Sequence, residues 1–496
     1  MLDRPALRSA GGQNGSVTSA GDVLVIGASF AGLFSAAAAQ RAGAHVTVLE
    51  RDELSDDAAE RPGVPQGGQP HVLLHRGLVA TQQLLPGLRE ELLAAGGVPL
   101  DTGDIPWLSP DGWLPTGVSA FEIVSLSRPL LELLVRRRVL ALDGVELRTG
   151  VRVRGLSRAG DRWQVTCDDG ACHVADTVID ASGRSSRLPR WLAGLGISTP
   201  EPAVVEAKLG YATRRYRASR PLPLDTGVVV AATPETSAGA LALPVEDDQW
   251  LVCGAGYGER RPDRDTDAFD RYLRSLSDPA LADLIQLLEP VDEVRIHRQT
   301  ANRRHRYDRV RRWPGGLLVV GDALTAFNPL YGQGITVAAC QAQLLSRSLG
   351  RRLDRRATRR VQAELAQIAD FPWAVATGED VRYPSCSERQ TLGQRLSHVW
   401  SQRVNQLAVG GNITCRRTLG GIYHMMVPAI MLFSPRIVGP VLVSLIRGVP
   451  PQGPRPAALT AIDGRSQLPA RGAGSSAGGH EADASPGPPV SPQPGL

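Results

Sequence analysis

The chain has 496 residues, of which 42% are hydrophobic, and a formal net charge of +5. A chain of this length can bury a large core, and we expect one large unit or two interlocked ones. Basic residues form no block interleaved with aromatic side chains, which argues against a nucleic-acid partner. The six cysteines form neither a CxxC pair nor a spaced framework, so we expect no metal site and a reducing, cytoplasmic location.

The two ends differ in composition from the rest of the chain. Residues 1–20 lack the continuous apolar stretch of a signal peptide and are expected to form a disordered leader. Residues 450–496 are rich in Pro, Gly, Ser and Ala, which predicts a disordered tail. The apolar runs "MMVPAIMLF" and "IVGPVLVSLI" are shorter than the roughly 18–20 residues of a membrane span. No transmembrane helix is therefore expected, and these runs are interpreted as buried or capping helices, with weak membrane contact as the alternative.

Residues 22–51 have the pattern of a strand, a tight turn, a helix and a second strand. The run "DVLVIG" is β-branched, "AGLFSAAAAQRAG" contains strong helix formers up to Gly43, and "HVTVLER" again favours a strand. The turn almost spells G-x-G-x-x-G, with Ser29 in place of the middle glycine. Gly27 permits the sharp bend, and Gly32 lets the helix pack close to the strand.

This turn predicts a dinucleotide site, with a plain βαβ core as the alternative. The middle position lets the backbone approach a pyrophosphate, and serine is small enough to allow that and can donate a hydrogen bond. Glu50 ends the second strand, where it can accept hydrogen bonds from an adenosine ribose. These residues alone do not distinguish NAD from FAD. The cofactor-binding residues expected here are Gly27, Ser29, Phe30, Ala31, Gly32, Glu50 and Arg51.

The next informative stretch is "RPGVPQGGQPHVLLHRG", residues 61–77. Its Pro and Gly turns predict a rigid, irregular loop, and after the βαβ unit it is expected beside the cofactor. Arg61 and Gln69 are expected to bind the cofactor. His71 is a candidate general base, with a structural or cofactor-contacting histidine as the alternative.

Alternating segments between residues 226 and 258, such as "TGVVVAAT" and "QWLVCGAGYG", predict an antiparallel sheet that roofs the cofactor. Apolar side chains from this sheet and from residues 420–446 are expected to line a tunnel for a long apolar substrate. Core packing is the alternative for each of them.

The segment "GGLLVVGDALTAFNPLYGQGITVAACQAQLL" favours FAD over NAD. It predicts a strand over residues 317–320, a Pro/Gly loop and a helix from about Gly334. FAD extends far beyond its pyrophosphate and needs such a second element, whereas a nicotinamide does not. Asp322 can accept from a ribityl hydroxyl, and the helix N-terminus can stabilise reduced flavin. An ordinary βα loop is the alternative; the expected cofactor-binding residues are Gly321, Asp322, Pro329, Gly332, Gly334 and Ile335.

These motifs resemble those of the flavoprotein monooxygenases with the p-hydroxybenzoate hydroxylase fold, a family that includes squalene epoxidase and flavin-dependent halogenases. The "GD…P…G.G" pattern matches the second FAD signature, and "VIDASGRSSRLPRWL" matches the central motif. The resemblance covers about residues 20–350. It implies that Arg128 reaches the FAD phosphate and ribityl region, that the backbone of Val153 touches adenine, and that Asp180 belongs to the cofactor site.

The fold class expected from these elements is mixed α/β. A Rossmann-like FAD-binding domain (21–195 and 296–350) is interleaved with an antiparallel-sheet substrate domain (196–295), followed by C-terminal helices (351–449).

The loop over residues 61–77 and "FPWAVATGEDVRYP" (371–384) resemble bacterial epoxidases of polyether antibiotic biosynthesis. That resemblance implies a linear polyene polyketide substrate, whose alkenes are epoxidised by a flavin C4a-hydroperoxide formed with O2. Lys208, the only lysine, lies too late in the chain for the lysine of a flavin-dependent halogenase, and the W-x-W-x-I-P motif is absent. An aromatic hydroxylase and a non-catalytic FAD-binding protein that handles a polyketide are the alternatives.

The source of electrons follows from the same motifs. No second fingerprint predicts a separate nicotinamide domain, so NAD(P)H acts directly or through a partner flavin reductase. The central motif has Asp180-Ala181 where the family is usually rich in Asp-Gly, which favours the partner reductase.

Overall fold

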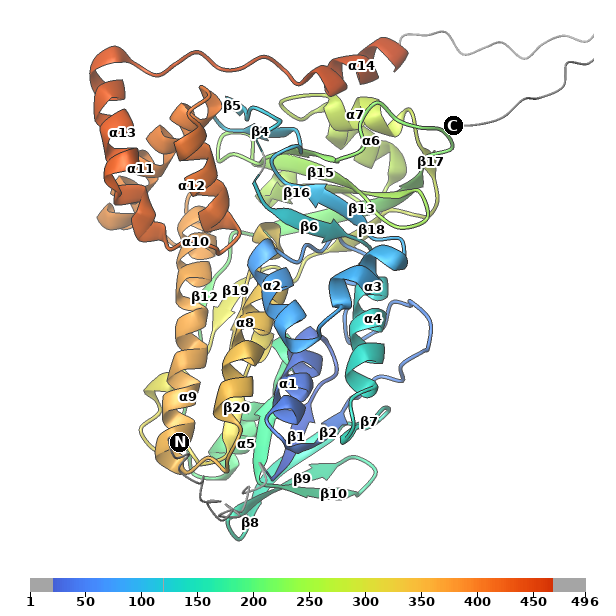
Figure 1. Cartoon of the computed structure of the whole chain (residues 1–496), viewed down its shortest axis with the longest axis vertical. Helices are drawn as coiled ribbons and strands as arrows, with labels where there is room; N and C mark the ends of the chain where they lie inside the picture. Colours follow the sequence, from blue (N-terminus) through green and yellow to red (C-terminus); the bar gives the residue numbers. More distant parts are fainter. Residues whose placement is uncertain (1–20, 119, 467–496) are drawn as a thin grey trace, which may run out of the picture.

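The fold is that of a computed structural model, which describes residues 21–118 and 120–466. The predictions for residues 1–20 and 467–496 lie outside these residues. One half of the molecule contains a parallel sheet flanked by helices, and the other half contains a large, mainly antiparallel sheet (Figure 1). The C-terminal helices run along one side and over the top. This arrangement confirms the predicted fold class.

The parallel sheet carries the predicted βαβ unit. Its strand order is β20-β11-β1-β2-β7, and all neighbours are parallel, with Val25 aligned to Val48 on one side and to Ile179 on the other. The strands are β1 (Asp22–Ile26), β2 (His45–Leu49), β7 (Val145–Arg148), β11 (Thr177–Asp180) and β20 (Leu317–Val319). Because β1, β11 and β20 end at the same edge, segments far apart in the sequence meet there.

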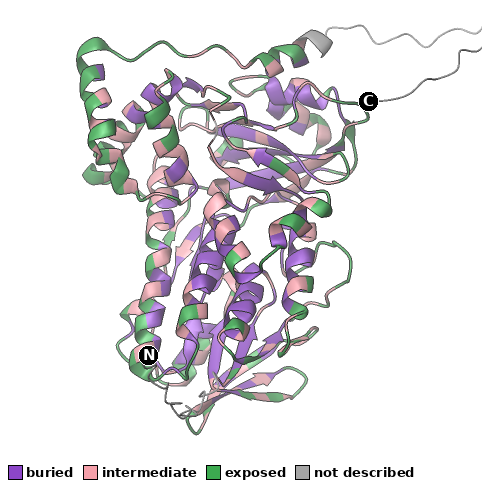
Figure 2. Ribbon diagram, in the orientation of Figure 1, coloured by how far each residue is buried: buried purple, intermediate pink, exposed green. Residues whose placement is uncertain are grey.

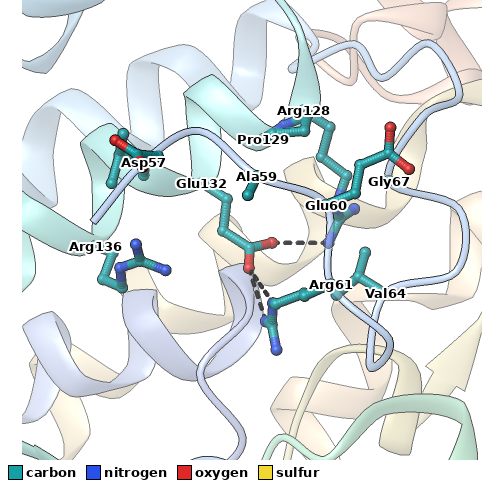
Figure 3. A pocket seen from close by; sticks show the side chains of 11 residues that line it. Asp57, Ala59, Glu60, Arg61, Val64, Gly67, Arg128, Pro129, Glu132 and Arg136 are labelled. Carbon is teal, nitrogen blue, oxygen red and sulfur yellow. Dashed lines mark hydrogen bonds and ion pairs between the residues drawn. The ribbon is translucent and has the colours of Figure 1, made fainter. Parts of the chain in front are cut away.

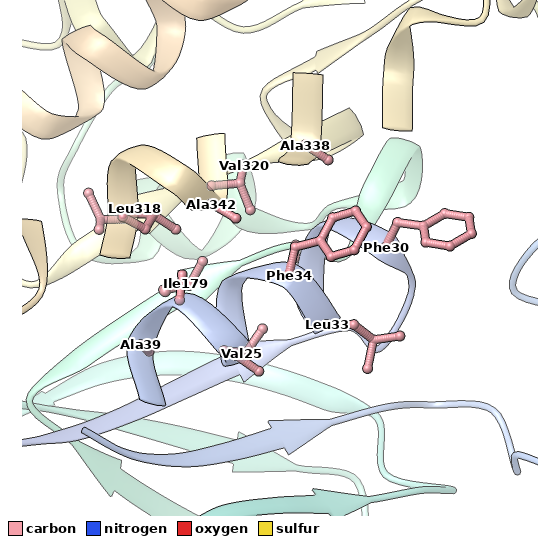
Figure 4. Close-up of a cluster of buried hydrophobic side chains, with 14 of the residues drawn as sticks. Val25, Phe30, Leu33, Phe34, Ala39, Ile179, Leu318, Val320, Ala338 and Ala342 are labelled. Carbon is pink, nitrogen blue, oxygen red and sulfur yellow. The ribbon is translucent and has the colours of Figure 1, made fainter. Parts of the chain in front are cut away.

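The helix α1 (Phe30–Arg41) lies at the centre of the core. Its residues Leu33 to Ala39 are all buried, because the sheet covers one side and α8 (Gln333–Ser348) packs against the other. Figure 4 shows Phe34 of α1 among Ile179 of β11, Val320 just after β20 and Ala338 of α8. A helix that is apolar all round is stable only where it is covered all round.

The large sheet has the order β17-β13-β16-β15-β14-β4-β5, with β18 also paired to β13. The predicted segment over residues 226–258 supplies β14, β15 and β16, and the β15–β16 and β13–β16 pairs are antiparallel. The strands β4 and β5 come from residues 107–113, which the sequence assigned to the first domain segment, and β4 pairs with β14 in parallel. The strands are β4 (Trp107–Ser109), β5 (Gly112–Trp113), β13 (Leu209–Arg217), β14 (Val228–Val230), β15 (Ala238–Pro244), β16 (Gln249–Tyr257), β17 (Glu289–Pro290) and β18 (Arg295–His297).

Smaller elements complete the two halves. The short strands are β3 (Val98–Asp101), β6 (Glu122–Ser125), β8 (Val153–Ala159), β9 (Arg162–Cys167), β10 (Cys172–Ala175), β12 (Ala203–Val205), β19 (Asn302–Arg304) and β21 (Thr325–Ala326). The further helices before residue 350 are α2 (His75–Leu84), α3 (Leu88–Ala94), α4 (Arg128–Leu140), α5 (Leu188–Gly194), α6 (Thr266–Arg274) and α7 (Ala280–Ile285). Short 3-10 turns are η1 (Gly183–Ser185), η2 (Gly258–Arg260), η3 (Tyr307–Arg309), η4 (Gly321–Ala323), η5 (Pro329–Tyr331) and η6 (Ala429–Phe433).

The C-terminal region is helical up to residue 466. It comprises α9 (Arg355–Ile368), α10 (Asp370–Asp380), α11 (Leu392–Val409), α12 (Ile413–Tyr423), α13 (Pro435–Arg447) and α14 (Ala457–Ser466). The sequence predicted a disordered tail from residue 450, but Leu459 and Ile462 of α14 are buried in the core beside α7. This part of the prediction is corrected, because two well-spaced apolar residues in a Pro-rich stretch are enough to dock one short helix.

The second apolar run forms α13, which is only partly covered. Figure 2 shows this arm mostly in the exposed and intermediate colours, and Ile446 is 89% exposed. The prediction that these runs form buried or capping helices therefore holds for a minority of their residues. Among the described residues, no helix combines the length and apolar character of a membrane span. Weak contact with a lipid surface stays a prediction.

Candidate functional site

The turn between β1 and α1 is set by two glycines. Gly27 has a φ of +103°, and a Cβ at that position would lie 2.7 Å from the carbonyl oxygen of Ala181. A Cβ on Gly32 would collide with the carbonyl oxygen of Gly27. Only glycine fits both positions, so the turn brings the start of α1 directly over the carboxyl edge of the sheet.

The first turn of α1 has no side-chain cap. Ser29 is the N-cap residue, but its hydroxyl forms no capping bond to the helix. Instead, Oγ accepts a hydrogen bond from Nη2 of Arg128 (2.8 Å) and donates one to Oε2 of Glu132 (3.2 Å). The first turn of α1 contains no acidic residue. The partial positive charge of this helix end is therefore not neutralised by its own sequence.

Glu50 stabilises the same turn from the end of β2. Its Oε2 accepts a hydrogen bond from the backbone N–H of Ala28 (2.7 Å), and its Oε1 accepts one from the N–H of Asp52 (3.1 Å). The residue is 5% exposed and lies 3.2 Å from Nη1 of Arg61. The carboxylate of Glu50 therefore lies where the sequence analysis expected an acceptor for the ribose. Two backbone N–H groups already donate to it.

A cluster of arginines and one glutamate lies beside this turn (Figure 3). Nε and Nη2 of Arg61 both lie 2.7 Å from Oε1 of Glu132, and Nη2 of Arg128 lies 3.1 Å from Oε2 of the same carboxylate. Arg61 also contacts Asp52 at 3.0 Å. Arg128 and Glu132 are one helical turn apart on α4, and Arg136 follows on the same face of that helix in the pocket lining.

Arg128 is the most constrained member of this cluster. It is 6% exposed, its guanidinium lies 4.8 Å from the ring centre of Phe30, and its Nε is buried with no hydrogen-bond partner in the described part of the chain. Burial lowers the pKa of Arg128 and the carboxylate of Glu132 opposes that shift. A buried cation with an unused donor, beside an uncapped helix start, fits the phosphates of a dinucleotide.

The segment from β20 to the start of α8 packs directly against the turn between β1 and α1. Gly321 has a φ of +56°, and a Cβ there would lie 2.5 Å from the Cβ of Ala31. Its N–H donates to Oε1 of Gln341 on α8 (2.8 Å). The two motifs, almost 300 residues apart in the sequence, thus meet in space because Gly321 has no side chain where the methyl group of Ala31 approaches it.

The loop that follows leads into the start of α8. The 3-10 turn η5 begins after Asn328, and Gly332 takes the left-handed conformation (φ +63°) as the N-cap of α8, with no side-chain capping bond. The carboxylate of Asp322 lies beside this helix start, near Gly334, and is 3.4 Å from Nε of Arg184. Pro329 lies in η5, and Ile335 is buried in the first turn of α8.

Gln69 ties the loop over residues 61–77 to the large sheet, and His71 bonds to the backbone of Gln69 within that loop. The amide of Gln69 accepts from Oγ1 of Thr213 (2.6 Å) and donates to the carbonyl of Arg295 (3.3 Å). Nδ1 of His71 lies 2.8 Å from the carbonyl oxygen of Gln69, which makes Nδ1 the protonated nitrogen. Burial and the charge of Arg128 lower the pKa of His71 to about 3. His71 is therefore neutral near pH 7, with Nε2 as an acceptor, and it is a weak base.

The predicted cofactor-binding residues Asp180, Val153 and Arg51 form contacts outside the cluster of Arg61, Arg128 and Glu132. The Asp180 carboxylate is fully buried and accepts hydrogen bonds from Ser182 and Ser186 in its own loop, and burial raises its pKa. Val153 is buried at the start of β8. Arg51 is largely exposed and donates to Oγ of Ser185 (3.3 Å).

The sequence analysis missed Glu132 and Asn328. Glu132 could have been found from its spacing of four residues after Arg128, which is the spacing of an ion pair on a helix. Asn328 could have been found from its position before Pro329, where an amide side chain commonly caps a turn.

Comparison with known proteins places the chain in a family. It is 35% identical to Protein Rv3254 of Mycobacterium tuberculosis over 348 residues, which are 66% of this chain and 72% of that protein. The chain belongs to the same family as that mycobacterial protein. A family model described as squalene epoxidase matches residues 196–373 of the chain. These residues include most of the large sheet and the segment from β20 to α8.

Solved structures show the fold of this family. PqsL of Pseudomonas aeruginosa, a probable FAD-dependent monooxygenase, is 20% identical, with a TM-score of 0.57 over 73% of this chain and 97% of that one. The anhydrotetracycline hydroxylase OxyS of Streptomyces rimosus is 21% identical, with a TM-score of 0.54 over 82% of this chain and 76% of that one. A flavoprotein/dehydrogenase of Cytophaga hutchinsonii is 15% identical, with a TM-score of 0.61 over 86% and 98%. The chain therefore has the fold of these flavin-dependent enzymes.

Proposed function

We propose that this protein binds FAD between the starts of α1 and α8 and is a flavin-dependent monooxygenase. The observation that carries the proposal is the buried guanidinium of Arg128, which has an unused Nε donor and lies beside the uncapped start of α1. The start of α1 lies next to the segment that leads into α8, because Gly321 of that segment contacts Ala31 of α1. A dinucleotide longer than NAD needs both segments in one place.

The residues present fit FAD in the following way. Ser29, Arg128 and the first turn of α1 hold the pyrophosphate, and Glu50 accepts from the adenosine ribose. Asp322 accepts from the ribityl chain, and the start of α8 faces the flavin ring. Two helix starts and the guanidinium of Arg128 lie here beside the carboxylates of Glu50, Glu132 and Asp322. The phosphates of the cofactor would be held by the helix starts and by Arg128.

FAD, when bound, supplies the reduction of O2 by which one oxygen atom enters the substrate and the other leaves as water. The protein's contribution is to position the substrate and to exclude water. Leu209 and Tyr211 of β13 and Cys253, Ala255 and Tyr257 of β16 form a buried cluster, against which Leu330 packs just before the start of α8. This mainly apolar packing lies beside the site proposed for the cofactor.

The substrate class that we propose is a linear polyene polyketide, whose alkenes are epoxidised. The whole chain, in its length and its C-terminal apolar segments, resembles the monensin epoxidase. Epoxidation of an electron-rich alkene requires no protein base, whereas hydroxylation of a phenol requires one. Burial and the charge of Arg128 lower the pKa of His71 to about 3, so His71 is a poor candidate for the base that phenol hydroxylation needs. The electrons come from NAD(P)H, either directly or through a partner flavin reductase.

The first experiment is to measure the flavin content of the purified protein and of two variants. The Asp322→Ala variant is expected to lose FAD and its yellow colour, and the His71→Ala variant to keep the colour and change turnover. A wild-type protein that binds no flavin would overturn the proposal.

The second experiment tests the substrate class. A linear triene polyketide is incubated with the FAD-loaded protein, a flavin reductase, NADPH and 18O2, and the product is analysed by mass spectrometry. Incorporation of up to three labelled oxygen atoms supports sequential epoxidation. Oxygenation of phenols with no conversion of the triene would contradict the epoxidase assignment and leave the monooxygenase assignment standing.

A further inference from the structure

The buried carboxyl group of Asp380 contacts the loop that leads into α8, and it belongs to none of the motifs of the sequence analysis. Asp380 is the last residue of α10 and is 1% exposed. Its Oδ2 accepts a hydrogen bond from Nδ2 of Asn302 (2.6 Å), and its Oδ1 accepts one from Nδ2 of Asn328 (2.8 Å). The hydroxyl of Tyr257 lies 3.4 Å from Oδ1. No cation forms an ion pair with Asp380 within residues 21–118 and 120–466.

These partners come from different parts of the fold. Asn302 lies in β19, Tyr257 ends β16 of the large sheet, and Asn328 precedes the turn into α8. The carboxyl of Asp380 therefore joins the C-terminal helices to the sheet and to the second cofactor segment. Burying a carboxylate without a cation costs free energy. The fold nevertheless directs three donors from three elements at this carboxylate, which suggests that the carboxylate has a role.

The orientation of both amides shows which protonation state the cluster fits. Oδ1 of Asn328 accepts from the N–H of Leu330 (2.9 Å) and from the hydroxyl of Tyr211 (3.2 Å). Oδ1 of Asn302 accepts from the N–H of Asn328 (2.7 Å). Each amide oxygen is thus occupied by donors, and each amide N–H must point at Asp380. Two fixed donors facing two carboxyl oxygens match an ionised carboxylate, which accepts only.

A proton on this carboxyl group disturbs the cluster. The only partner that can reverse its role is the hydroxyl of Tyr257, because a hydroxyl donates or accepts whereas an amide N–H only donates. A proton on Oδ1 therefore competes with the donor of Asn328. That amide also caps the η5 turn, so its displacement changes the turn that begins α8.

Burial raises the pKa of Asp380 to about 7, and the hydrogen bonds from Asn328, Asn302 and Tyr257 oppose that shift. Acidic groups surround this carboxyl: Glu379 on α10, Tyr383 and Cys386 just after it, Tyr211 on β13, Tyr257 on β16 and Tyr331 in η5. The arginines that also act on these tyrosines, Arg382 and Arg184, form their ion pairs with Glu379 and Asp322 instead of Asp380.

We propose that Asp380 is a positioning residue for the flavin: its ionised carboxylate holds Asn328, and through it the start of α8, in the conformation that binds the cofactor. The proposal rests on the FAD site proposed above. By linkage, FAD then binds the ionised form more tightly, so FAD affinity increases as the pH rises through the range in which Asp380 loses its proton.

The experiment measures the FAD dissociation constant of the deflavinated full-length protein from pH 5.5 to 8.5, for the wild type and Asp380→Asn. We expect the wild-type affinity to increase about tenfold over this range, the size of one charge-assisted hydrogen bond. The Asp380→Asn variant, whose amide presents N–H groups to the two asparagines, is expected to bind about tenfold more weakly at pH 8 and to lose most of the pH dependence. The matched control is Glu364→Gln, a carboxyl-to-amide change on exposed α9, which is expected to keep the wild-type profile.

A second variant, Tyr257→Phe, tests whether Asp380 acts through its charge or only supports the structure. Tyr257→Phe removes one donor and leaves the carboxyl in place, so the midpoint of the pH profile should move upward with the affinity at pH 8.5 nearly retained. An Asp380→Asn variant with the wild-type pH profile, or a Tyr257→Phe variant with an unmoved midpoint, would overturn the positioning role. If the wild type binds no FAD at any pH, the proposed function itself fails. In that case, hydrogen exchange of residues 325–335 in the FAD-free protein at the same pH values still tests whether the carboxyl holds the turn.

Discussion

The two turns that begin α1 and α8, between which we propose that FAD binds, are built in different ways. The turn at Gly27–Gly32 is shaped by missing side chains, and the backbone N–H groups of Gly27 and Ala28 donate to Leu49 and Glu50 at the end of the neighbouring strand β2. The turn at Asn328–Gly332 is held by side chains from β19, β13 and α10, which lie up to 117 residues away in the sequence. A turn of the first kind is visible in a short motif, whereas a turn of the second kind depends on the rest of the fold.

The largest effect is expected at the first turn. Gly32→Ala places a methyl group against the carbonyl oxygen of Gly27, where the strand and helix leave no room. We expect a loss of roughly 4 kcal/mol or more of unfolding free energy, which leaves little folded protein. The control is Gly43→Ala, at a positive φ but with nothing within 4 Å of the new Cβ, which should cost only about 1–2 kcal/mol. Thermal unfolding followed by circular dichroism compares the two, and equal losses would contradict the steric account of this turn.

The contact between the two turns is expected to have the next largest effect. Gly321→Ala brings two Cβ atoms to 2.5 Å and should cost roughly 2–3 kcal/mol of stability. Ala31→Gly removes the opposing methyl group, so the double variant should be more stable than the sum of the single changes predicts. A double-mutant cycle of unfolding free energies measures this coupling, and strict additivity would mean that the two segments do not touch.

Arg128 tests whether the first turn binds the phosphates. Arg128→Met keeps the length of the side chain and removes its charge-assisted hydrogen bonds, so FAD should bind roughly 30–100-fold more weakly. Arg138→Met, on the exposed side of the same helix, should change FAD affinity less than about twofold. Fluorescence titration of the deflavinated proteins gives both values. An unchanged affinity in Arg128→Met would remove this residue from the cofactor site.

The smallest effect concerns the second turn and the stability of the protein without FAD. The pKa of Asp380 in the folded chain, about 7, lies above its usual value of 3.8, so the protonated form stabilises the fold. This contribution is complete below about pH 4 and is lost as the pH rises through about 7. Between pH 6 and 8 the FAD-free wild type should lose about 1 kcal/mol that Asp380→Asn does not lose. Denaturant unfolding at the two pH values measures the difference, and parallel losses in both proteins would place the pKa of Asp380 elsewhere.

Much of the fold could be predicted because it follows from local patterns. The β-branched runs and the apolar helix between them predicted β1, α1 and β2 to within a residue or two, and alternation predicted β14, β15 and β16. The docked helix α14 could not be predicted, because its two buried residues have meaning only beside α7. Likewise, β4 and β5 join the large sheet through a parallel pairing to β14 that no local pattern marks.

The candidate site divides along the same line. The sequence by itself determined that one turn must consist of glycine and small residues, that an acid ends the next strand, and that a second Gly-rich turn begins another helix. These are properties of backbone conformation, which short motifs encode. Only the tertiary structure decided that Arg61 and Arg128 share Glu132, that Gly321 lies against Ala31, and that Asp380 holds Asn328. Those are contacts between distant segments, and their energies depend on burial and on which donors face which acceptors.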